Sequence, residues 1–245
     1  MTMQSTAASL AVHSEWRRNS ALGPIIGVGA LMAPGAVWLG APEAAVAAAL
    51  YCAVAIIVAA RVQAFHPFAT FGAANSVTLF RAALLSLVAP LVLLEASGER
   101  HFTLIFGLAV FILLLDALDG WLARRAGTAS RFGARFDMEV DAGLIMLLAS
   151  FAWLDGKAGA WVLMVGLMRY GFVAAGWLFP KLARALPESR RRKIICVIQI
   201  VALCALVLPV IAPPVSTLIA FVALALLTIS FLIDVRSLLR QDRST

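Results

Sequence analysis

The amino-acid sequence predicts an all-α fold, a bundle of helices that crosses a membrane several times. Hydrophobic residues make up 62% of the 245 residues and charged residues only 13%, whereas soluble domains carry about 25% charged residues. Apolar segments recur along the whole chain, and a segment of about 20 such residues can cross a bilayer's hydrocarbon core. The class of protein is therefore set before any motif is considered.

Eight apolar segments are expected to span the membrane. Residues 1–20 are polar and are expected to form a cytoplasmic tail or a short interfacial helix. The stretch 61–76 mixes polar and apolar residues and separates an N-terminal helix pair at 21–62 from a six-helix remainder within 63–245. His66 in this stretch is interpreted as a loop residue rather than a ligand. The expected spans are 21–40, 42–62, 75–96, 102–124, 137–156, 158–180, 193–212 and 214–236.

Basic residues gather in alternate connections between these spans. The positive-inside rule then predicts that both termini are cytoplasmic, and the even number of spans agrees with this. Topology accounts for most of the net charge of +7, so nucleic acid is not expected as a partner, whereas anionic membrane lipids are. We expect an integral protein of a bacterial cytoplasmic membrane. The basic residues are Arg17, Arg18, Arg124, Arg125, Arg131, Arg135, Lys181, Arg184, Arg190, Arg191, Arg192, Lys193, Arg236, Arg240 and Arg243.

Two pairs of aspartates stand at the facing ends of the fourth and fifth spans. Asp116 and Asp119 share one helical face, as do Asp137 and Asp141, because residues three or four apart are neighbours on a helix. The connection between the spans is short, so four carboxylates are expected to converge at the cytoplasmic boundary. Such a cluster needs cations, and Mg²⁺ or Mn²⁺ prefers carboxylate oxygens. Two ions are the usual arrangement for displacement at phosphorus; the alternative is interfacial acids neutralised by the adjacent arginines.

Other residues within the same stretch suit a phosphate-containing ligand. Gly120, Ala123 and Gly133 are small enough to let helices approach closely or to leave room for a base or phosphate. Arg124 can bind phosphate oxygens in a bidentate manner. Ser130 could supply a hydroxyl donor. Ordinary helix packing is the alternative for each small residue taken alone.

The complete stretch resembles a known signature. Residues 116–141 read Asp-x2-Asp-Gly-x2-Ala-Arg-x8-Gly-x3-Asp-x3-Asp, which is similar to the signature of the CDP-alcohol phosphotransferases, also called CDP-alcohol phosphatidyltransferases. The resemblance covers about residues 70–236. It implies a transferase of phospholipid biosynthesis that moves a phosphatidyl group from CDP-diacylglycerol to an alcohol, releases CMP and forms a homodimer.

The resemblance also implies roles for individual residues. Asp116, Asp119 and Asp137 would hold two Mg²⁺ or Mn²⁺ ions, and Asp141 would complete the metal cluster and act as general base. The stretch "NSVTLFR" is similar to an Asn-x2-Thr-x2-Arg pattern that helps bind the nucleotide; a helix cap with a topology arginine is the alternative. The residues expected to contact the CDP donor are Asn75, Thr78, Arg81, Gly120, Ala123, Arg124, Ser130 and Gly133.

The acceptor site is implied by basic residues further along the chain. Arg169 lies inside a predicted span, where an ionisable side chain suggests a functional site. Together with Arg192 and Lys193 it would bind the acceptor's phosphate, although a positive-inside cluster is the alternative at 190–193. The chain departs from members that use glycerol 3-phosphate, because Ile195 and Cys196 stand where these carry a basic residue and a threonine. Glycerol 3-phosphate is nevertheless the first expectation and inositol phosphate the second.

Two other classes of membrane protein use buried acidic residues. A UbiA-like prenyltransferase also binds a diphosphate through aspartates and Mg²⁺, but its two motifs lie far apart in sequence. An ion-coupled transporter would be expected to show internal repeats or broken helices, which the sequence does not display. A catalytically inactive scaffold is disfavoured because all eight signature positions are present.

Overall fold

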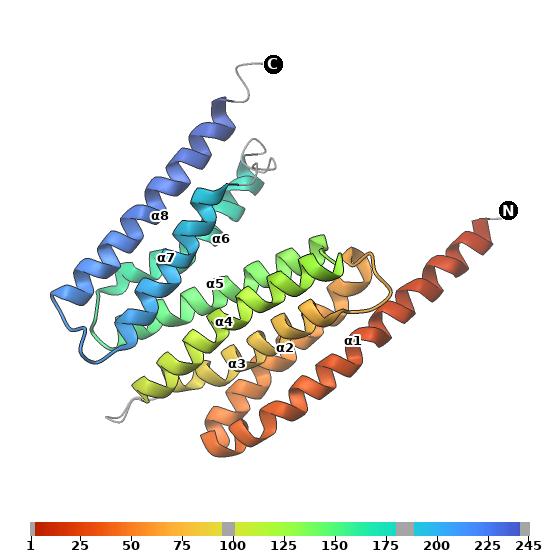
Figure 1. Cartoon of the computed structure of the whole chain (residues 1–245), viewed down its shortest axis with the longest axis horizontal. Helices are drawn as coiled ribbons and strands as arrows, with labels where there is room; N and C mark the ends of the chain where they lie inside the picture. Colours follow the sequence, from red (N-terminus) through yellow and green to blue (C-terminus); the bar gives the residue numbers. More distant parts are fainter. Residues whose placement is uncertain (1–2, 95–100, 180–188, 241–245) are drawn as a thin grey trace. The chain divides into compact units, whose positions relative to one another are not determined.

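The computed structural model describes residues 3–94, 101–179 and 189–240. Within these residues the chain consists of helices and connections without a strand, which confirms the predicted all-α class. Figure 1 shows the helices. They are α1 (Met3–Leu39), α2 (Ala41–Phe65), α3 (Ala73–Leu93), α4 (Phe102–Ala126), α5 (Arg131–Leu154), the short 3₁₀ helix η1 (Ala160–Leu163), α6 (Met164–Leu178), α7 (Arg190–Val207) and α8 (Val215–Arg240). The basic residues Lys181, Arg184 and Arg243 lie outside the described residues.

Five of the described helices are long and apolar enough to cross a membrane: α1 from Ser20, α2, α3, α4 and α8 as far as Leu238. Large aliphatic side chains are exposed on their outer faces; Ile26 and Ile56 are each 69% exposed. Exposed apolar surface of this kind is typical of a lipid-facing helix. Membrane spans at the other three expected positions stay predictions, since α5 and α7 begin with charged residues and α6 is short.

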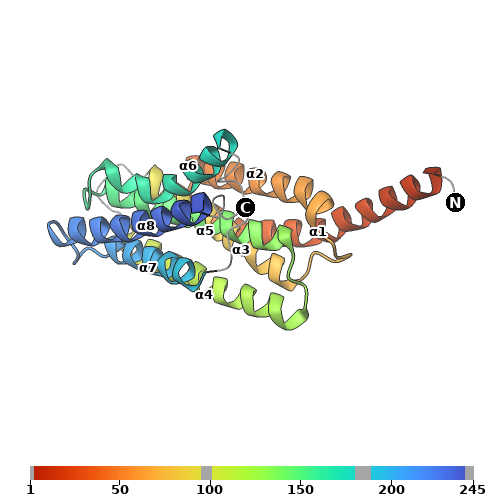
Figure 2. The ribbon, with the colours of Figure 1, turned by 90° about the horizontal axis from the view of Figure 1, so that it is seen from above.

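The chain forms two compact units, which divide α4 and α5 between them. The first comprises residues 1–101 and 107–141, and the second comprises residues 102–106 and 142–245. In the first unit α1, α2 and α3 pack pairwise against one another. The α1 helix runs without interruption from Met3, so the polar residues up to 20 belong to the same helix as the first expected span (Figures 1 and 2).

A hydrophobic cluster joins the N-terminal helix pair to the rest of the first unit. It contains Val28 of α1, Val58 and Val62 of α2, Leu79 of α3 and Phe132 in the first turn of α5. The hydroxyl of Tyr51 also donates a hydrogen bond to the carbonyl oxygen of Ile25, at 2.7 Å. The pair is therefore packed into the same core as the start of α5.

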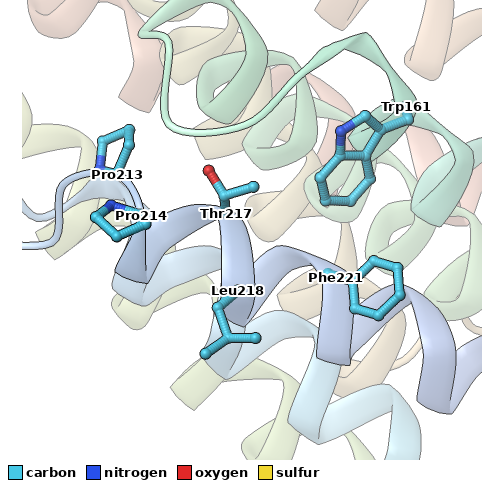
Figure 3. Close-up of a pocket in the computed structure, with 6 residues that line it drawn as sticks. All are labelled: Trp161, Pro213, Pro214, Thr217, Leu218 and Phe221. Atoms are coloured by element: carbon cyan, nitrogen blue, oxygen red, sulfur yellow. The ribbon is translucent and has the colours of Figure 1, made fainter.

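In the second unit, α7 packs against α8. Gln199 donates a hydrogen bond from Nε2 to the carbonyl oxygen of Ala223, at 2.7 Å. The buried ammonium group of Lys157 donates to the carbonyl oxygens of Leu208 and Ile211, which closes the connection before α8. An open groove of about 750 Å³ lies beside this connection and is lined mainly by apolar side chains (Figure 3): Trp161, Pro213, Pro214, Thr217, Leu218 and Phe221.

Candidate active site

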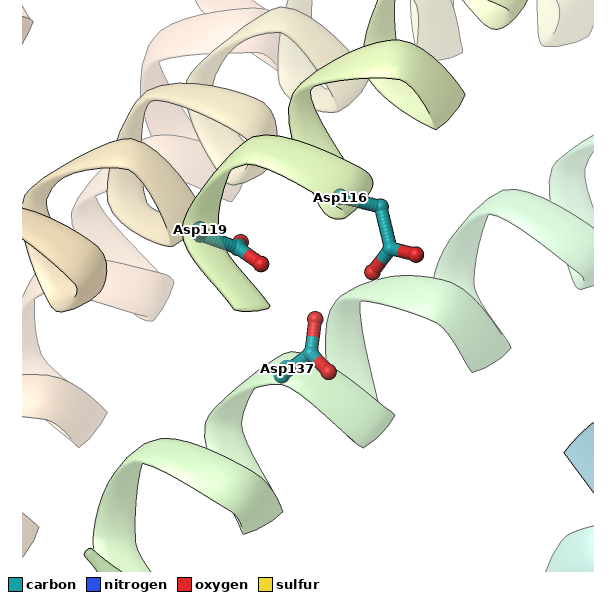
Figure 4. A group of neighbouring side chains, drawn as sticks. All are labelled: Asp116, Asp119 and Asp137. Atoms are coloured by element: carbon teal, nitrogen blue, oxygen red, sulfur yellow. The ribbon is translucent and has the colours of Figure 1, made fainter. Parts of the chain in front are cut away.

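Three carboxylates from α4 and α5 come together within the first unit. Asp116 and Asp119 lie one turn apart on α4, and Asp137 lies near the start of α5. One oxygen of each lies within 4.8 Å of the others, and Figure 4 shows the three side chains pointing into the space between the two helices. We call these residues the three-carboxylate group. The sequence prediction that the two motif helices bring acidic residues together agrees with this geometry.

Asp141, one turn beyond Asp137, is not part of this close group. Its Oδ1 lies 2.5 Å from Nη2 of Arg81, and its side chain is 19% exposed. Asp141 is therefore linked to the other three motif aspartates through Arg81, and its own carboxylate is not one of the closely placed three.

Arg81 of α3 contacts all four motif aspartates. Its Nη1 lies 2.8 Å from Oδ2 of Asp119 and 2.5 Å from Oδ1 of Asp137, and its Nη2 lies 3.0 Å from Oδ1 of Asp116. The side chain is fully buried, and its Nε has no hydrogen-bond partner among the described residues. One guanidinium against four carboxylates leaves three negative charges in excess when all are ionised, so the site favours further cations.

Thr78 and Asn75 lie on the same face of α3 as Arg81. The hydroxyl of Thr78 donates to Oδ2 of Asp119 at 2.9 Å, and both Thr78 and Asn75 are buried. The Asn75 side chain donates from Nδ2 to the carbonyl oxygen of Phe71, at 2.6 Å. This face of α3 therefore contacts Asp119 through Thr78 and Arg81, and contact with a nucleotide stays a prediction.

The connection between α4 and α5 has a defined conformation. Gly127 ends α4 with a φ of 63°, a left-handed conformation that favours glycine. Ser130 caps α5, because its Oγ accepts the backbone N–H of Gly133 at 3.0 Å. A Cβ at position 133 would lie only 2.7 Å from Oδ1 of Asn75, so this glycine permits the close approach of α3.

The remaining motif residues lie further along α4. Arg124 is exposed, and its guanidinium folds back over Gly120, with Nη1 3.2 Å from where a Cβ at that position would lie. Ala123 is half-buried. Arg125 lies over the Trp121 ring, 4.9 Å from the ring's centre. The exposed guanidinium of Arg124 is accessible to a ligand.

The residues expected at the acceptor site belong to the second unit. Arg192 of α7 lies 3.7 Å from Oδ1 of Asp234 on α8. Arg191 binds the same carboxylate and also donates to the carbonyl oxygen of Ser230, at 2.8 Å. Arg169 is half-buried in α6, and Lys193 is exposed. Two arginines of the basic cluster thus form ion pairs with one buried carboxylate, that of Asp234.

Two residues of these clusters were not singled out as functional from the sequence. Asp234 forms ion pairs with Arg191 and Arg192, and no local sequence signal connects it to these arginines. His66 does end α2 in a connection, as interpreted. However, it is 1% exposed, and its Nδ1 lies 3.2 Å from Oγ of Ser130. The sequence signal for a packed His66 was its position beside phenylalanines in "HPFATF".

Within the described residues, the protein thus combines helices that are apolar enough to cross a membrane with a partly exposed acidic group between α4 and α5. Residues 71–232 match the model of the CDP-alcohol phosphatidyltransferase family, and the chain belongs to this family. The protein is accordingly a transferase of substituted phosphate groups in phospholipid biosynthesis, which transfers a phosphatidyl group from a CDP-alcohol to an acceptor. No solved structure matches the chain.

Proposed function

We propose that this protein transfers the phosphatidyl group of CDP-diacylglycerol to a phosphorylated polyol, with glycerol 3-phosphate as the first candidate, and releases CMP. The observation that carries the proposal is the three-carboxylate group, which lies within the family match and within reach of a shared cation. Inositol phosphate is the second candidate acceptor.

The donor set fits a hard divalent cation. All three closely placed ligand atoms are carboxylate oxygens, which suit Mg²⁺ or Mn²⁺ better than softer metals. We propose two ions, held by Asp116, Asp119 and Asp137 with Asp141 completing the set. When bound there, these ions would neutralise negative charge that develops on the CMP leaving group.

The protein's own residues would orient the reactants and move the proton. Asp141 is partly exposed and would accept the proton of the acceptor hydroxyl, whose oxygen forms the new bond to the phosphatidyl phosphorus. The bond from that phosphorus to the CMP oxygen breaks. Thr78 and Arg81 would keep Asp119 in place, and the accessible guanidinium of Arg124 would bind a donor phosphate bidentately.

The acceptor and the membrane orientation complete the proposal. Arg169, Arg192 and Lys193 would bind the acceptor's phosphate. By the positive-inside rule, the basic connections support cytoplasmic termini and an active site on the cytoplasmic face. We propose a bacterial inner membrane, in which anionic lipids would surround the protein. A homodimer is expected from the family resemblance.

A panel of acceptors tests this function. The full-length protein purified in detergent receives CDP-diacylglycerol, Mg²⁺ or Mn²⁺, and one of glycerol 3-phosphate, inositol phosphate, glycerol or inositol, and released CMP is measured. We expect release with a phosphorylated polyol and none after the metal is chelated. Release only with an unphosphorylated alcohol would refute the proposed acceptor class, and no release with any acceptor would refute the proposed reaction.

A further inference from the structure

We propose that His66 is a positioning residue that holds the first turn of α5, and hence Asp137, in place through Ser130. His66 precedes the family match, which begins at Phe71, and lies in the connection between the N-terminal helix pair and α3. The link to activity rests on the proposed function, whereas the link to metal affinity can be measured without turnover.

The His66 ring is built into the protein interior. The residue is 1% exposed, and its ring packs edge-on against Phe68 and Phe132, with centroid distances of 5.5 and 5.8 Å. Buried polar side chains need hydrogen-bond partners, because an unsatisfied buried group costs about 1–3 kcal/mol. Nδ1 and Nε2 of His66 each have a hydrogen-bond partner, on opposite sides of the ring.

The direction of these hydrogen bonds follows from the partners. Nε2 of His66 lies 2.9 Å from the carbonyl oxygen of Thr70. A carbonyl oxygen can only accept, so Nε2 carries the proton. In the neutral ring Nδ1 is then an acceptor for the hydroxyl of Ser130, at 3.2 Å. The same hydroxyl oxygen accepts the N–H of Gly133. A continuous chain of hydrogen bonds thus runs from the first turn of α5 to the connection before α3.

This series of hydrogen bonds ends one helical turn from Asp137, a proposed metal ligand. Asp137 follows Gly133 by one helical turn and belongs to the three-carboxylate group. A Cβ at position 133 would lie only 2.7 Å from Oδ1 of Asn75, whose side chain donates a hydrogen bond to the carbonyl oxygen of Phe71. A shift of the α5 cap would therefore move Asp137 relative to the two aspartates on α4.

The same geometry suggests a role for the N-terminal helix pair. Phe71 and Phe132 pack against each other at a centroid distance of 6.3 Å, and both belong to the hydrophobic cluster that includes Val58 and Val62 of α2 and Val28 of α1. Because α2 leads directly into His66, the pair holds the connection against the start of α5.

Metal affinity provides the test. The full-length variants in detergent, without substrates, are titrated with Mn²⁺, and free Mn²⁺ is followed by its paramagnetic resonance signal. Removing an outer partner of a metal ligand typically weakens metal binding about 10–100-fold, and we expect His66→Ala to weaken Mn²⁺ binding about tenfold, at the low end of that range. His101→Ala is the matched control, since His101 is exposed and its ring contacts Trp38 instead.

Two conservative variants separate the hydrogen bond to Ser130 from packing. Asparagine places an amide oxygen as far from the backbone as Nδ1, and glutamine places its amide as far as Nε2. We expect His66→Asn to retain most of the Mn²⁺ affinity and His66→Gln to lose it. Ser130→Ala should weaken binding as much as His66→Ala, and adding His66→Ala to Ser130→Ala should cause little further loss.

Each outcome decides the inference. Unchanged Mn²⁺ affinity in His66→Ala, or retention by His66→Gln but not by His66→Asn, would overturn it. If His66→Ala does not fold, near-normal binding by His66→Asn together with the loss in Ser130→Ala supports it, and equal loss in His66→Asn and His66→Gln overturns it. A wild-type protein that binds Mn²⁺ but releases no CMP would refute the proposed function alone.

Discussion

The two units of this protein each contain a cluster of charged side chains, and the clusters differ in the sign of their excess charge. In the first unit, Arg81 lies among four motif aspartates and leaves a negative excess. In the second, Asp234 lies between Arg191 and Arg192, which leaves a positive excess. Burial also differs, since the Arg81 side chain is fully buried whereas the side chains of Arg191 and Arg192 are each 30% exposed.

The difference shows which kind of ligand each cluster can attract. An acidic cluster that holds only one buried guanidinium retains carboxylate oxygens for cations, as a metal-dependent transferase requires. A pair of arginines that share one carboxylate retains N–H donors for an anion such as a phosphate. Substitutions at Asp141, Arg81, Gly133 and Arg192 test this contrast.

The largest effect is expected from loss of the charge on Asp141. Asp141→Asn preserves shape but removes the proton acceptor, so CMP release should fall by about 10²–10⁴-fold, the usual contribution of a general base. Glu139→Gln is the matched control, because Glu139 lies on the same helix and is exposed. Full activity in Asp141→Asn would show that the carboxylate takes no part in the proton transfer.

Removal of the Arg81 cation from the acidic cluster should destabilise the protein. Arg81→Met leaves four carboxylates without their common partner, and breaking a buried ion pair in this way costs about 3–5 kcal/mol. Thermal unfolding in detergent should show a lower midpoint, and Mn²⁺ should raise that midpoint more in the variant than in the wild type. The exposed Arg61, which lies over Phe65, provides the control variant Arg61→Met. Equal unfolding midpoints for Arg81→Met and Arg61→Met would contradict a stabilising role for Arg81.

A methyl group at position 133 should disturb the acidic cluster without changing its charge. In Gly133→Ala the new Cβ would lie 2.7 Å from Oδ1 of Asn75. Either the buried Asn75 side chain must leave its hydrogen bond to Phe71 or α3 and α5 must separate, at a cost of about 1–3 kcal/mol for overpacking. Unfolding and Mn²⁺ titration measure the effect. Gly107→Ala should be tolerated, since a Cβ there meets no atom within 4 Å; comparable losses in both variants would show that the close approach is not the cause.

The smallest effect is expected in the basic cluster. Arg192→Ala should raise the KM for a phosphorylated acceptor about tenfold, the value of one charge-assisted hydrogen bond, and leave the KM for CDP-diacylglycerol unchanged. Arg190→Ala is the matched control, because Arg190 is exposed at the start of the same helix. Equal changes in the two variants would favour a purely topological role for the cluster.

Much of the acidic site could be predicted from the sequence because its spacing is local. Asp116 and Asp119 share a helical face by their separation alone, as do Thr78 and Arg81, and both members of the second pair contact Asp119 in the structure. The fold class and the family followed from apolar segment length and from the eight signature positions. The number of bound ions and the acceptor stay predictions.

Other parts of the site could not be predicted because they depend on contacts between distant segments. Arg81 was expected to face the nucleotide, and only the packing of α3 against α4 and α5 brings it to all four carboxylates. Ser130 was expected to donate to the ligand, whereas its Oγ caps α5 and contacts His66, 64 residues away in the sequence. Periodicity carries no information about such pairs.

The sequence by itself determined that this chain is a helical membrane protein, that it belongs to a family of phosphatidyl transferases, and that its acidic residues lie on shared helical faces. Hydrophobic length and residue spacing are local properties, so the sequence displays them directly. Only the tertiary structure decided that Arg81 is the common partner of the aspartates, and that His66 and the N-terminal pair pack against the start of α5. Those contacts depend on how helices pack, and close packing is decided by side chains from many segments at once.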